Sequence, residues 1–408
     1  MSPLFIYMNK ITLDKFFDLY PSPYPFDVPE RIAKGLRRPY DINDEKHLIF
    51  PEKNSKRKSI ENVLIVGSGY SEGLYHALRN PDINFVCVDF SGKAIKYSND
   101  KVKEYSLNNI TFHNTDLLSF NTDVNFDVIY AINILQYLKD PIEGLNKCLN
   151  LLDKSGALLV SVSSSYYYDD IDYMRILLNK LNYDYTQLKD IEESLNFLKG
   201  LDNLHPSKIR MVDGKGWIDN NDFVSRYMAP IHQSFSINNI FSLISDAKCY
   251  FQGWYHNYLY YPSALIREKN ALHINLYDKI NSLPDTEKWD AVCRIFRSKN
   301  DRFSHTFCLR KEKKLEKFDF KLLNKKETII SLRPYQLIKT LPNQTESFAL
   351  ISNFQRKLSS SELKICNLVK NPMKIDKLLE DKSLNLNKQE IALTLTKLLE
   401  SSIIYLYE

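Results

Sequence analysis

The stretch VLIVGSGYSEG, residues 63–73, decides the fold. Its β-branched beginning predicts a short strand buried on both sides, and Gly67 and Gly69 follow this strand directly, where a helix opens. Glycines at such a turn let the backbone approach a ligand, while the free N–H groups of the helix start attract a carboxylate or phosphate. The stretch therefore predicts the first strand–turn–helix unit of a parallel sheet, with a ligand at the turn.

Strands and helices continue to alternate on the C-terminal side of this unit. The pattern predicts further strands at 84–90, 110–114, 126–133 and 156–164, and helices at 71–80, 91–107 and 141–152. Two late strands are expected at 248–255 and 301–311, with a helix between them. Such alternation requires right-handed crossovers, so we expect an α/β fold with a doubly wound, seven-stranded Rossmann-like sheet.

The length of 408 residues indicates more than one domain. We predict a helical and loop preamble at 1–58, a main domain at 59–311 with a helical insertion at 165–235 that covers the substrate, a Lys-rich connector at 312–326, and a small domain at 327–408. In this last part, residues 327–338 and 346–353 are expected to pair as strands, and a helix to be capped by Ser360. Three helices and a final strand follow the paired strands, a pattern typical of a winged helix.

Composition excludes several classes of protein. The net charge of +5 is mild and spread along the chain, which argues against a nucleic-acid-binding arm. No stretch approaches the roughly 20 apolar residues of a membrane span, so we expect a soluble, cytoplasmic protein without a membrane partner. The six cysteines are far apart in the sequence, which predicts buried thiols and no metal site.

Two aspartates lie where the next strands end. Asp89 ends the second strand, 20 residues after Gly69, where its carboxylate can accept hydrogen bonds from two ribose hydroxyls. Asp116 follows the third strand and can accept from an adenine amino group. Glu72 stands where a dinucleotide motif has its third glycine, and the GK[ST] of a triphosphate loop is absent. The expected ligand is therefore an adenosine with an amino-acid tail.

In order along the chain, VLIVGSGYSEG, VCVDFS, ITFHNTDLL, FDVIYAINILQYLKDP and LLDKSGALLVSV resemble the motifs of class I S-adenosylmethionine-dependent methyltransferases. YPSPYP, His205-Pro206 and HQSFSINNIFSLI are similar to a bacterial branch that is sometimes fused to tetratricopeptide repeats. The resemblance implies S-adenosylmethionine as cofactor, held by Gly67, Ser68, Gly69, Asp89, Phe90, Asp116, Leu117 and Asn133. Ile65 and Ser71 depart from the pattern, since an acidic residue and a glycine are common there.

Methyl transfer needs a nucleophile aligned with the sulfonium and, for a protonated acceptor, a base. His232 is the candidate base, with Tyr227 and Asp222 nearby in the sequence, and a purely structural histidine is the alternative. Gln136 and Tyr137 occupy the positions that border the methyl group in the family. Tyr166 and Tyr24 are further candidates for contact with the substrate.

The C-terminal domain gives the one indication of a substrate. It is similar to accessory domains of protein methyltransferases and to peptide-recognition domains, which bind an extended segment by adding a strand to a sheet. We therefore expect methylation of an N or O nucleophile of a peptide or protein. Two alternatives stay open: a small-molecule methyltransferase whose C-terminal domain forms a homodimer, and a catalytically silent protein that binds the cofactor.

Overall fold

The computed structural model describes residues 12–21, 25–36, 40–42, 49–50, 59–210, 212–213, 216–264, 271–295, 304–313, 328–333, 337–340, 347–351 and 354–407. Contacts divide the chain into two units. The first comprises residues 1–41, 60–236 and 303–305, and the second comprises 42–59, 237–302 and 306–408. Tyr24, a predicted substrate contact, lies outside the described residues.

A seven-stranded sheet has the order β3-β2-β1-β4-β5-β9-β8. Its strands are β1 (Asn62–Val66), β2 (Asn84–Asp89), β3 (Ile110–Asn114), β4 (Phe126–Ile132), β5 (Leu152–Ser163), β8 (Tyr250–Trp254) and β9 (Ser304–Arg310). The strands β1 to β5 pair in parallel, with Val63 of β1 opposite Phe85 of β2 and Val128 of β4. The strands β8 and β9 are antiparallel. The predicted Rossmann-like sheet is confirmed, with its strand ends within a few residues of those expected.

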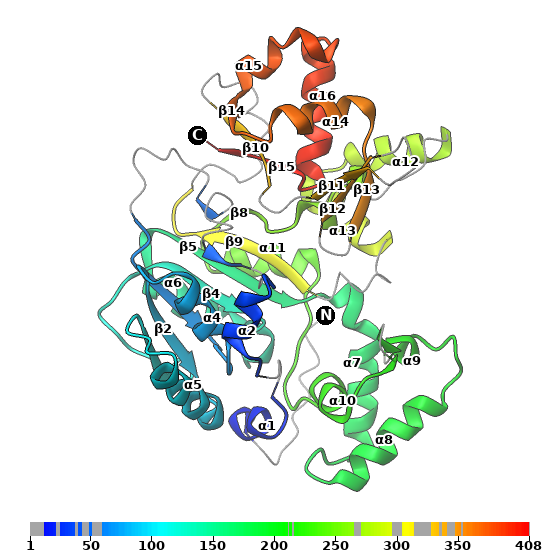
Figure 1. Cartoon of the computed structure of the whole chain (residues 1–408). Helices are drawn as coiled ribbons and strands as arrows, with labels where there is room; N and C mark the ends of the chain where they lie inside the picture. The colour runs from blue at the N-terminus through cyan, green and yellow to red at the C-terminus, as the bar shows by residue number, and fades with distance from the viewer. Residues whose placement is uncertain are drawn as a thin grey trace. The chain divides into compact units, whose positions relative to one another are not determined.

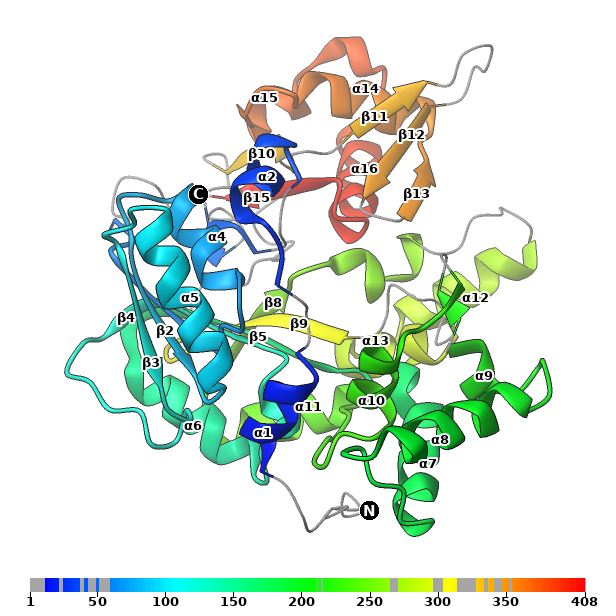
Figure 2. The ribbon, with the colours of Figure 1, turned by 60° about the horizontal axis from the view of Figure 1, so that its bottom comes forward.

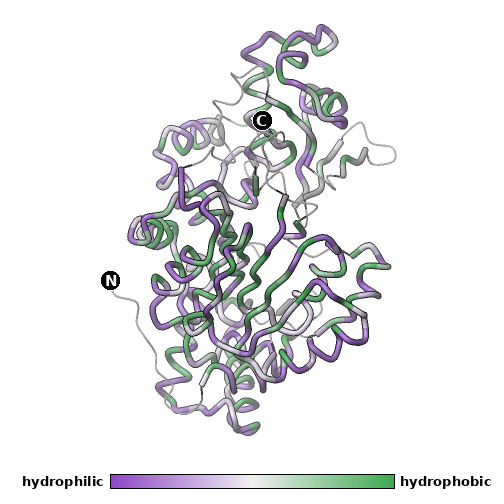
Figure 3. The backbone as a smooth tube through the Cα atoms, turned by 90° about the vertical axis from the view of Figure 1, so that its left-hand side faces the viewer, coloured by the Kyte–Doolittle hydropathy of each residue, from purple (hydrophilic) through white to green (hydrophobic). Residues whose placement is uncertain are grey.

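Three helices connect the parallel strands, and two of them begin at side-chain caps. They are α4 (Glu72–Arg79), α5 (Gly92–Glu104) and α6 (Pro141–Leu151). The Ser91 hydroxyl accepts a hydrogen bond from the Ala94 N–H, so Ser91 caps α5. Asp140 caps α6 in the same way, before a proline in the first turn. Figure 3 shows the hydrophilic and hydrophobic residues alternating along such helices.

Two short helices precede the sheet, α1 (Leu13–Leu19) and α2 (Val28–Ala33). The helix α1 was expected from the apolar pattern of residues 11–20. The helix α2 was not predicted, because prolines punctuate the segment. Asp27 nevertheless caps it by accepting from the Glu30 N–H at 2.7 Å. Just before α2, the Phe26 N–H donates to the Ser71 hydroxyl at 3.1 Å, so this segment is attached beside the glycine turn.

The insertion predicted at 165–235 is helical. It contains α7 (Ser165–Lys180), α8 (Leu188–Gly200), α9 (Pro206–Arg210) and α10 (Asn220–Tyr227), with the small hairpin of β6 (Val212–Asp213) and β7 (Gly216–Trp217). These helices gather around their own apolar core, to which α1 contributes the fully buried Phe16 (Figure 1). The insertion is thus a second folded body within the first unit, and its role in covering a substrate stays a prediction.

From residue 237 onward, the second unit contains the helices α11 (Ile237–Asp246), η3 (Asn257–Leu259), η4 (Pro262–Ala264), α12 (Ala271–Asn281) and α13 (Asp285–Ile295). Trp254 of β8 is buried and stacks on Tyr260 with 3.7 Å between the ring centroids. It also meets Trp289 of α13 edge-on at 5.4 Å. These large rings form much of the apolar interior of the unit.

Residues 328–407 contain two three-stranded antiparallel sheets, in the orders β14-β10-β15 and β11-β12-β13. The strands are β10 (Ile329–Leu332), β11 (Leu337–Thr340), β12 (Ser347–Ile351), β13 (Phe354–Lys357), β14 (Met373–Lys374) and β15 (Ile404–Tyr407), and the helices are α14 (Ser360–Leu368), α15 (Ile375–Leu379), η7 (Lys382–Leu384) and α16 (Lys388–Glu400). The predicted pairing holds for β11 and β12, but β10 pairs with β15 instead.

The cap of α14 was misplaced by one residue. Ser359, rather than Ser360, accepts from the Glu362 N–H, and Glu362 accepts from the Ser359 N–H in a reciprocal capping box. Three adjacent serines made the register ambiguous, and Glu362 decides it because its side chain reaches back to the residue three positions earlier. The winged-helix assignment of this region stays a prediction.

The predicted boundary at residue 327 cuts through contacts within the second unit. The Asn257 side chain donates to the Leu399 carbonyl at 3.4 Å, and the Tyr258 N–H donates to the Ser402 hydroxyl at 3.3 Å. All six cysteines are buried and carry no disulfide. Among the described residues, no helix has the length and apolarity to cross a membrane, and no cluster of His, Cys, Asp or Glu suits a metal.

Candidate functional site

The turn after β1 has the backbone that only glycine adopts readily. Gly67 and Gly69 have φ angles of +66° and +56°. A Cβ atom on Gly67 would lie 2.0 Å from the Cδ1 atom of Ile134, whereas one on Gly69 would meet nothing within 4 Å. Gly67 is thus required for packing against the segment after β4. Gly69 leaves space beside the turn, as a bound ligand needs.

Asp89 joins the glycine turn to the end of β2. One carboxylate oxygen accepts from the Gly69 N–H and the other from the Ser91 N–H, each at 2.8 Å. Burial raises the pKa of this carboxyl, and the two backbone hydrogen bonds oppose that rise. Each oxygen keeps a second lone pair. The carboxylate can therefore accept two more hydrogen bonds, such as those of a ribose diol.

The ends of β2 and β3 provide the neighbouring candidates. Phe90 is partly buried, and its backbone carbonyl accepts from the Asn114 side chain at 3.0 Å. Asp116 is exposed and caps its own turn by accepting from the Ser119 N–H at 3.0 Å. Partial burial acts to raise the pKa of Asp116, but the Ser119 hydrogen bonds outweigh it and lower the pKa. Leu117 is buried. An ionised Asp116 beside an apolar residue suits an adenine ring and its amino group.

The end of β4 places three polar residues beside the glycine turn. Asn133 has a left-handed backbone, with φ at +57°, and its side-chain oxygen accepts from the Ser161 hydroxyl at 3.1 Å. Gln136 is buried, and its Oε1 atom has no hydrogen-bond partner among the described residues. The buried Ser68 hydroxyl is equally without a partner there. Burial, and to a lesser extent the neighbouring Tyr168, raises the pKa of Tyr137, so its phenol stays neutral.

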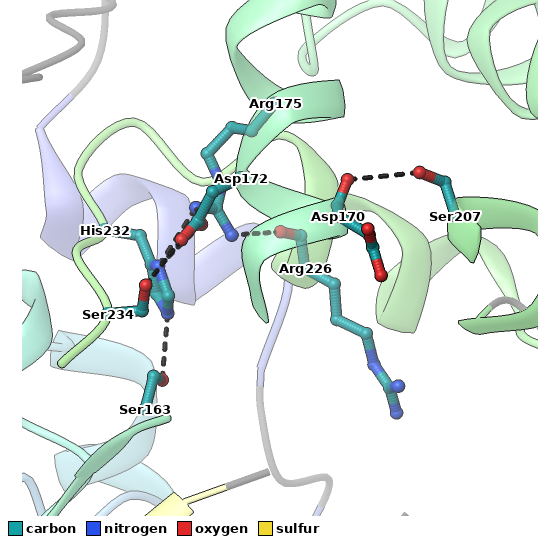
Figure 4. Close-up of polar contacts among 8 residues, drawn as sticks. All are labelled: Ser163, Asp170, Asp172, Arg175, Ser207, Arg226, His232 and Ser234. Carbon is teal, nitrogen blue, oxygen red and sulfur yellow. Dashed lines mark hydrogen bonds and ion pairs between the residues drawn. The ribbon is translucent and has the colours of Figure 1, made fainter. Parts of the chain in front are cut away.

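His232 lies in a buried polar network, shown in Figure 4. Its Nδ1 atom is 2.9 Å from an Arg175 nitrogen, and its Nε2 atom is 2.9 Å from the Ser163 hydroxyl. Arg175 also pairs with Asp172 and donates to the Arg226 carbonyl. The network thereby ties α7 and α10 of the insertion to the end of β5.

Arg175 can only donate, so the Nδ1 atom of His232 accepts and the proton of the neutral ring is on Nε2. The Asp172 carboxylate lies 3.5 Å from Nδ1 and acts to raise the pKa of His232. Burial and the Arg175 charge lower the pKa of His232 to about 4. A ring that is neutral, with its lone pair already bound, is poorly suited to the base role predicted from the sequence.

The other two predicted catalytic residues are directed elsewhere. The Tyr227 hydroxyl is buried in the helical core and donates to the Ser207 carbonyl at 3.1 Å, while its ring stacks on Phe223. Asp222 is partly exposed in the first turn of α10, and one of its carboxylate oxygens lies 3.9 Å from an Arg226 nitrogen. These residues are near His232 in the sequence, but both are in α10 whereas His232 lies in the loop that follows this helix.

Tyr168, rather than Tyr166, is the tyrosine of its run that meets the site. The Tyr168 ring lies 5.0 Å from the His232 ring, and Tyr137 meets the same ring edge-on at 5.6 Å. Tyr166 instead packs edge-on against His305 of β9 at 5.7 Å. Two residues along a helix differ by about 200° in direction, so Tyr166 and Tyr168 of α7 point to different neighbours.

No motif in the sequence indicates that α1 contributes to the site. Phe17 meets Tyr137 edge-on at 5.1 Å and lies 5.9 Å from Phe90. Asp18 accepts from the Ser91 hydroxyl at 2.5 Å. Tyr20, which follows α1, donates its hydroxyl to the Tyr185 carbonyl of the insertion at 2.5 Å. No pattern of residue types could locate α1, because its contacts are 70 or more residues away in the sequence.

Comparison with known proteins agrees with this arrangement. Residues 64–158 match the family model described as a methyltransferase domain. These residues form an S-adenosylmethionine-dependent methyltransferase domain. S-adenosylmethionine is accordingly the cofactor of this domain.

Solved structures share the fold of the methyltransferase. PKMT2 from Rickettsia typhi is 15% identical with a TM-score of 0.61, over 91% of this chain and 75% of that chain. The structure of PKMT2 in complex with AdoHcy is 14% identical with a TM-score of 0.61, and the match covers 90% of this chain and 75% of that chain. The plantazolicin methyltransferase BpumL, in complex with a pentazolic desmethylPZN analog and SAH, is 12% identical with a TM-score of 0.37. This match covers 74% of this chain and 90% of that chain. The likeness to PKMT2 shows a common fold that extends beyond the methyltransferase domain.

The residues at the strand ends fit the cofactor. Gly69 leaves open space, Asp89 has free lone pairs, and the buried oxygens of Ser68 and Gln136 lack partners among the described residues. Buried polar atoms without partners are costly, so a ligand that supplies N–H and O–H donors would stabilise them. When bound, S-adenosylmethionine supplies a methyl group activated by its sulfonium charge.

Proposed function

We propose that this methyltransferase methylates an N or O nucleophile of a peptide or protein. The main support for methyl transfer is the position of Asp89. Two backbone N–H groups donate to its buried carboxylate and hold it at the glycine turn. When bound, the cofactor would supply a methyl group to a lone pair of the acceptor, with its carbon–sulfur bond breaking as the new bond forms. The positive charge would pass to the acceptor or leave with a proton, and a neutral thioether would remain.

Different residues have different roles in this reaction. The residues Gly67, Ser68, Gly69, Asp89, Phe90, Asp116, Leu117 and Asn133 would hold the cofactor. Gln136 and Tyr137 border the acceptor, where the buried phenol excludes water and cannot act as an anion. His232 orients the Tyr137 and Tyr168 rings, because it contacts both while its two nitrogens are engaged. No titrating base is needed if the acceptor arrives with a free lone pair.

Two features support a polypeptide acceptor. The fold likeness to PKMT2 covers 91% of the chain, so the C-terminal region belongs to the shared architecture. Within residues 328–407, the outer strands β11 and β13 each pair with a single described strand, β12. An extended peptide can add to such an edge through main-chain hydrogen bonds. Binding there would raise the local concentration of the acceptor.

Transfer of a labelled methyl group tests this proposal. The full chain is incubated with methyl-tritiated S-adenosylmethionine and a cell extract separated into polypeptide and low-mass fractions. We expect label in the polypeptide fraction, sensitive to protease and absent with Asp89→Ala. Label in the low-mass fraction alone would instead support the small-molecule alternative. Cofactor binding without any transfer would support the silent binding protein.

A further inference from the structure

Phe17 contacts residues on both sides of the glycine turn. Phe90 follows β2 and Tyr137 follows β4, and these two strands flank β1 in the sheet. The Phe17 ring lies 5.9 Å from Phe90 and 5.1 Å from Tyr137, so it contacts one residue that follows each of these strands. It also packs against the apolar core of the insertion. Asp89 is adjacent to Phe90 in the sequence, so Phe17 contacts residues at both the expected ribose end and the expected methyl end of the site.

The helix α1 is held in this position from two sides. Asp18 accepts from the Ser91 hydroxyl at the start of α5, and the Lys93 side chain donates to the Asp18 carbonyl at 3.0 Å. On the other side, the Asn221 side chain donates to the Pro21 carbonyl at 2.9 Å. Figures 1 and 2 both show α1 between α5 and α10. The placement of Phe17 therefore depends on contacts with both the sheet and the insertion.

We infer that Phe17 contacts the cofactor and recognises the positive charge of its sulfonium. This inference rests on the proposed function, because it takes S-adenosylmethionine as the ligand. The sulfonium joins the ribose part of the cofactor to the transferable methyl, so it belongs between the Asp89 end and the Tyr137 end. An aromatic ring attracts a cation more strongly when water is excluded. The product S-adenosylhomocysteine has no such charge, and Phe17 favours the substrate form over it.

Binding measurements on Phe17→Leu test the inference without requiring turnover. Leucine keeps an apolar side chain but removes the π-system. Calorimetry should show S-adenosylmethionine binding weakened roughly three- to thirty-fold, while S-adenosylhomocysteine binding changes less than about two-fold. Phe17→Trp, which keeps and enlarges the π-system, should hold or raise the preference for the charged ligand. Equal weakening of both ligands, or no change in either, would overturn the inference.

Phe16→Leu is the matched control, since it changes the same residue type in the same helix. Phe16 is fully buried and meets Tyr185 edge-on at 5.1 Å, so its role is in the helical core. This variant should lower stability and leave the ratio of the two affinities unchanged. If Phe16→Leu alters the ratio as Phe17→Leu does, loosening of α1 explains both and the inference fails.

If Phe17→Leu does not fold, Phe17→Trp still tests the inference. A lower preference of this variant for S-adenosylmethionine over S-adenosylhomocysteine would contradict it. The outcome is also separable from the proposed function. Selective weakening by Phe17→Leu together with no label in polypeptides would sustain the inference and refute the peptide acceptor. A wild-type protein that binds neither ligand would refute both.

Discussion

The cofactor half of the site and its acceptor half are built in different ways. In the cofactor half, the Gly69 N–H of the turn after β1 donates to the Asp89 side chain at the end of β2, the strand next to β1 in the sheet. In the acceptor half, Tyr137, Tyr168 and His232 come from three segments and meet mainly through ring contacts. Short polar contacts between neighbouring strands follow from the sheet itself, whereas ring contacts depend on how the insertion packs. Four experiments separate the two halves, from the largest expected effect to the smallest.

The largest effect is expected from Asp89→Ala. Loss of two charge-assisted hydrogen bonds to the ribose should weaken binding of S-adenosylmethionine by about 2–4 kcal/mol, measured by calorimetry. Asp116→Ala, in which an exposed carboxylate is removed, is the control and should cost less. Affinity that is unchanged in Asp89→Ala would show that the cofactor half has been wrongly assigned.

The second experiment follows the stability of the acceptor half with pH. The pKa of His232 is about 4 in the fold and about 6.5 when unfolded, so the unfolded chain takes up a proton first as pH falls. Between pH 6.5 and 4 this histidine should therefore remove about 3 kcal/mol from the free energy of unfolding. Urea denaturation should show this loss in the wild type and a flatter profile in His232→Gln.

The same variant also separates the positioning role of His232 from a base role. Removal of a general base typically costs roughly 10²–10⁴ in turnover. We expect His232→Gln to lose less than this and to keep its affinity for the cofactor. A loss within the base range, together with a pH profile of turnover that loses one titrating group, would restore the base assignment.

The third experiment compares the two glycines of the turn. Gly67→Ala combines the strain of positive φ with an overlap of Cβ and the Ile134 Cδ1 atom, so it should destabilise the fold by about 2–4 kcal/mol. Gly69→Ala meets only open space and should cost about 1 kcal/mol of stability. Its main effect should be weaker cofactor binding. Equal loss of stability in the two variants would contradict the distinct roles.

The smallest effect is expected at the cap of α5. Ser91→Ala removes the hydroxyl that accepts from Ala94 and donates to Asp18. Thermal denaturation should show a loss of about 1 kcal/mol, the usual cost of an N-cap. Ser119→Ala lies on an exposed turn and serves as the control. A loss no larger than in this control would mean that α1 is held by its other contacts.

The strands and the cofactor half could be predicted because their signals are local. A β-branched run and the glycines after it define β1, and Asp89 lies at the end of the next strand. Parallel strands place their carboxyl ends at one edge, so residues that follow them converge whatever the rest of the chain does. The cap of α5 was equally predictable, because Ser91 acts on a residue three positions away.

The acceptor half and the C-terminal region could not be predicted in the same way. Tyr166 and Tyr168 are chemically alike, and only the orientation of α7 decides which of them meets His232. The strand β10 pairs with β15, about 75 residues further along, so a pattern read from neighbouring segments favoured the wrong partner.

The sequence by itself determined the Rossmann-like sheet, the glycine turn and the carboxylate beside it, because these features depend on residues within one or two adjacent elements. Only the tertiary structure decided that Phe17 meets Tyr137, that Arg175 occupies the lone pair of His232, and that Tyr227 turns to the helical core. Each of these contacts joins segments separated by 20 to 120 residues. Their geometry follows from the packing of whole helices, and packing is not encoded in any single stretch of residues.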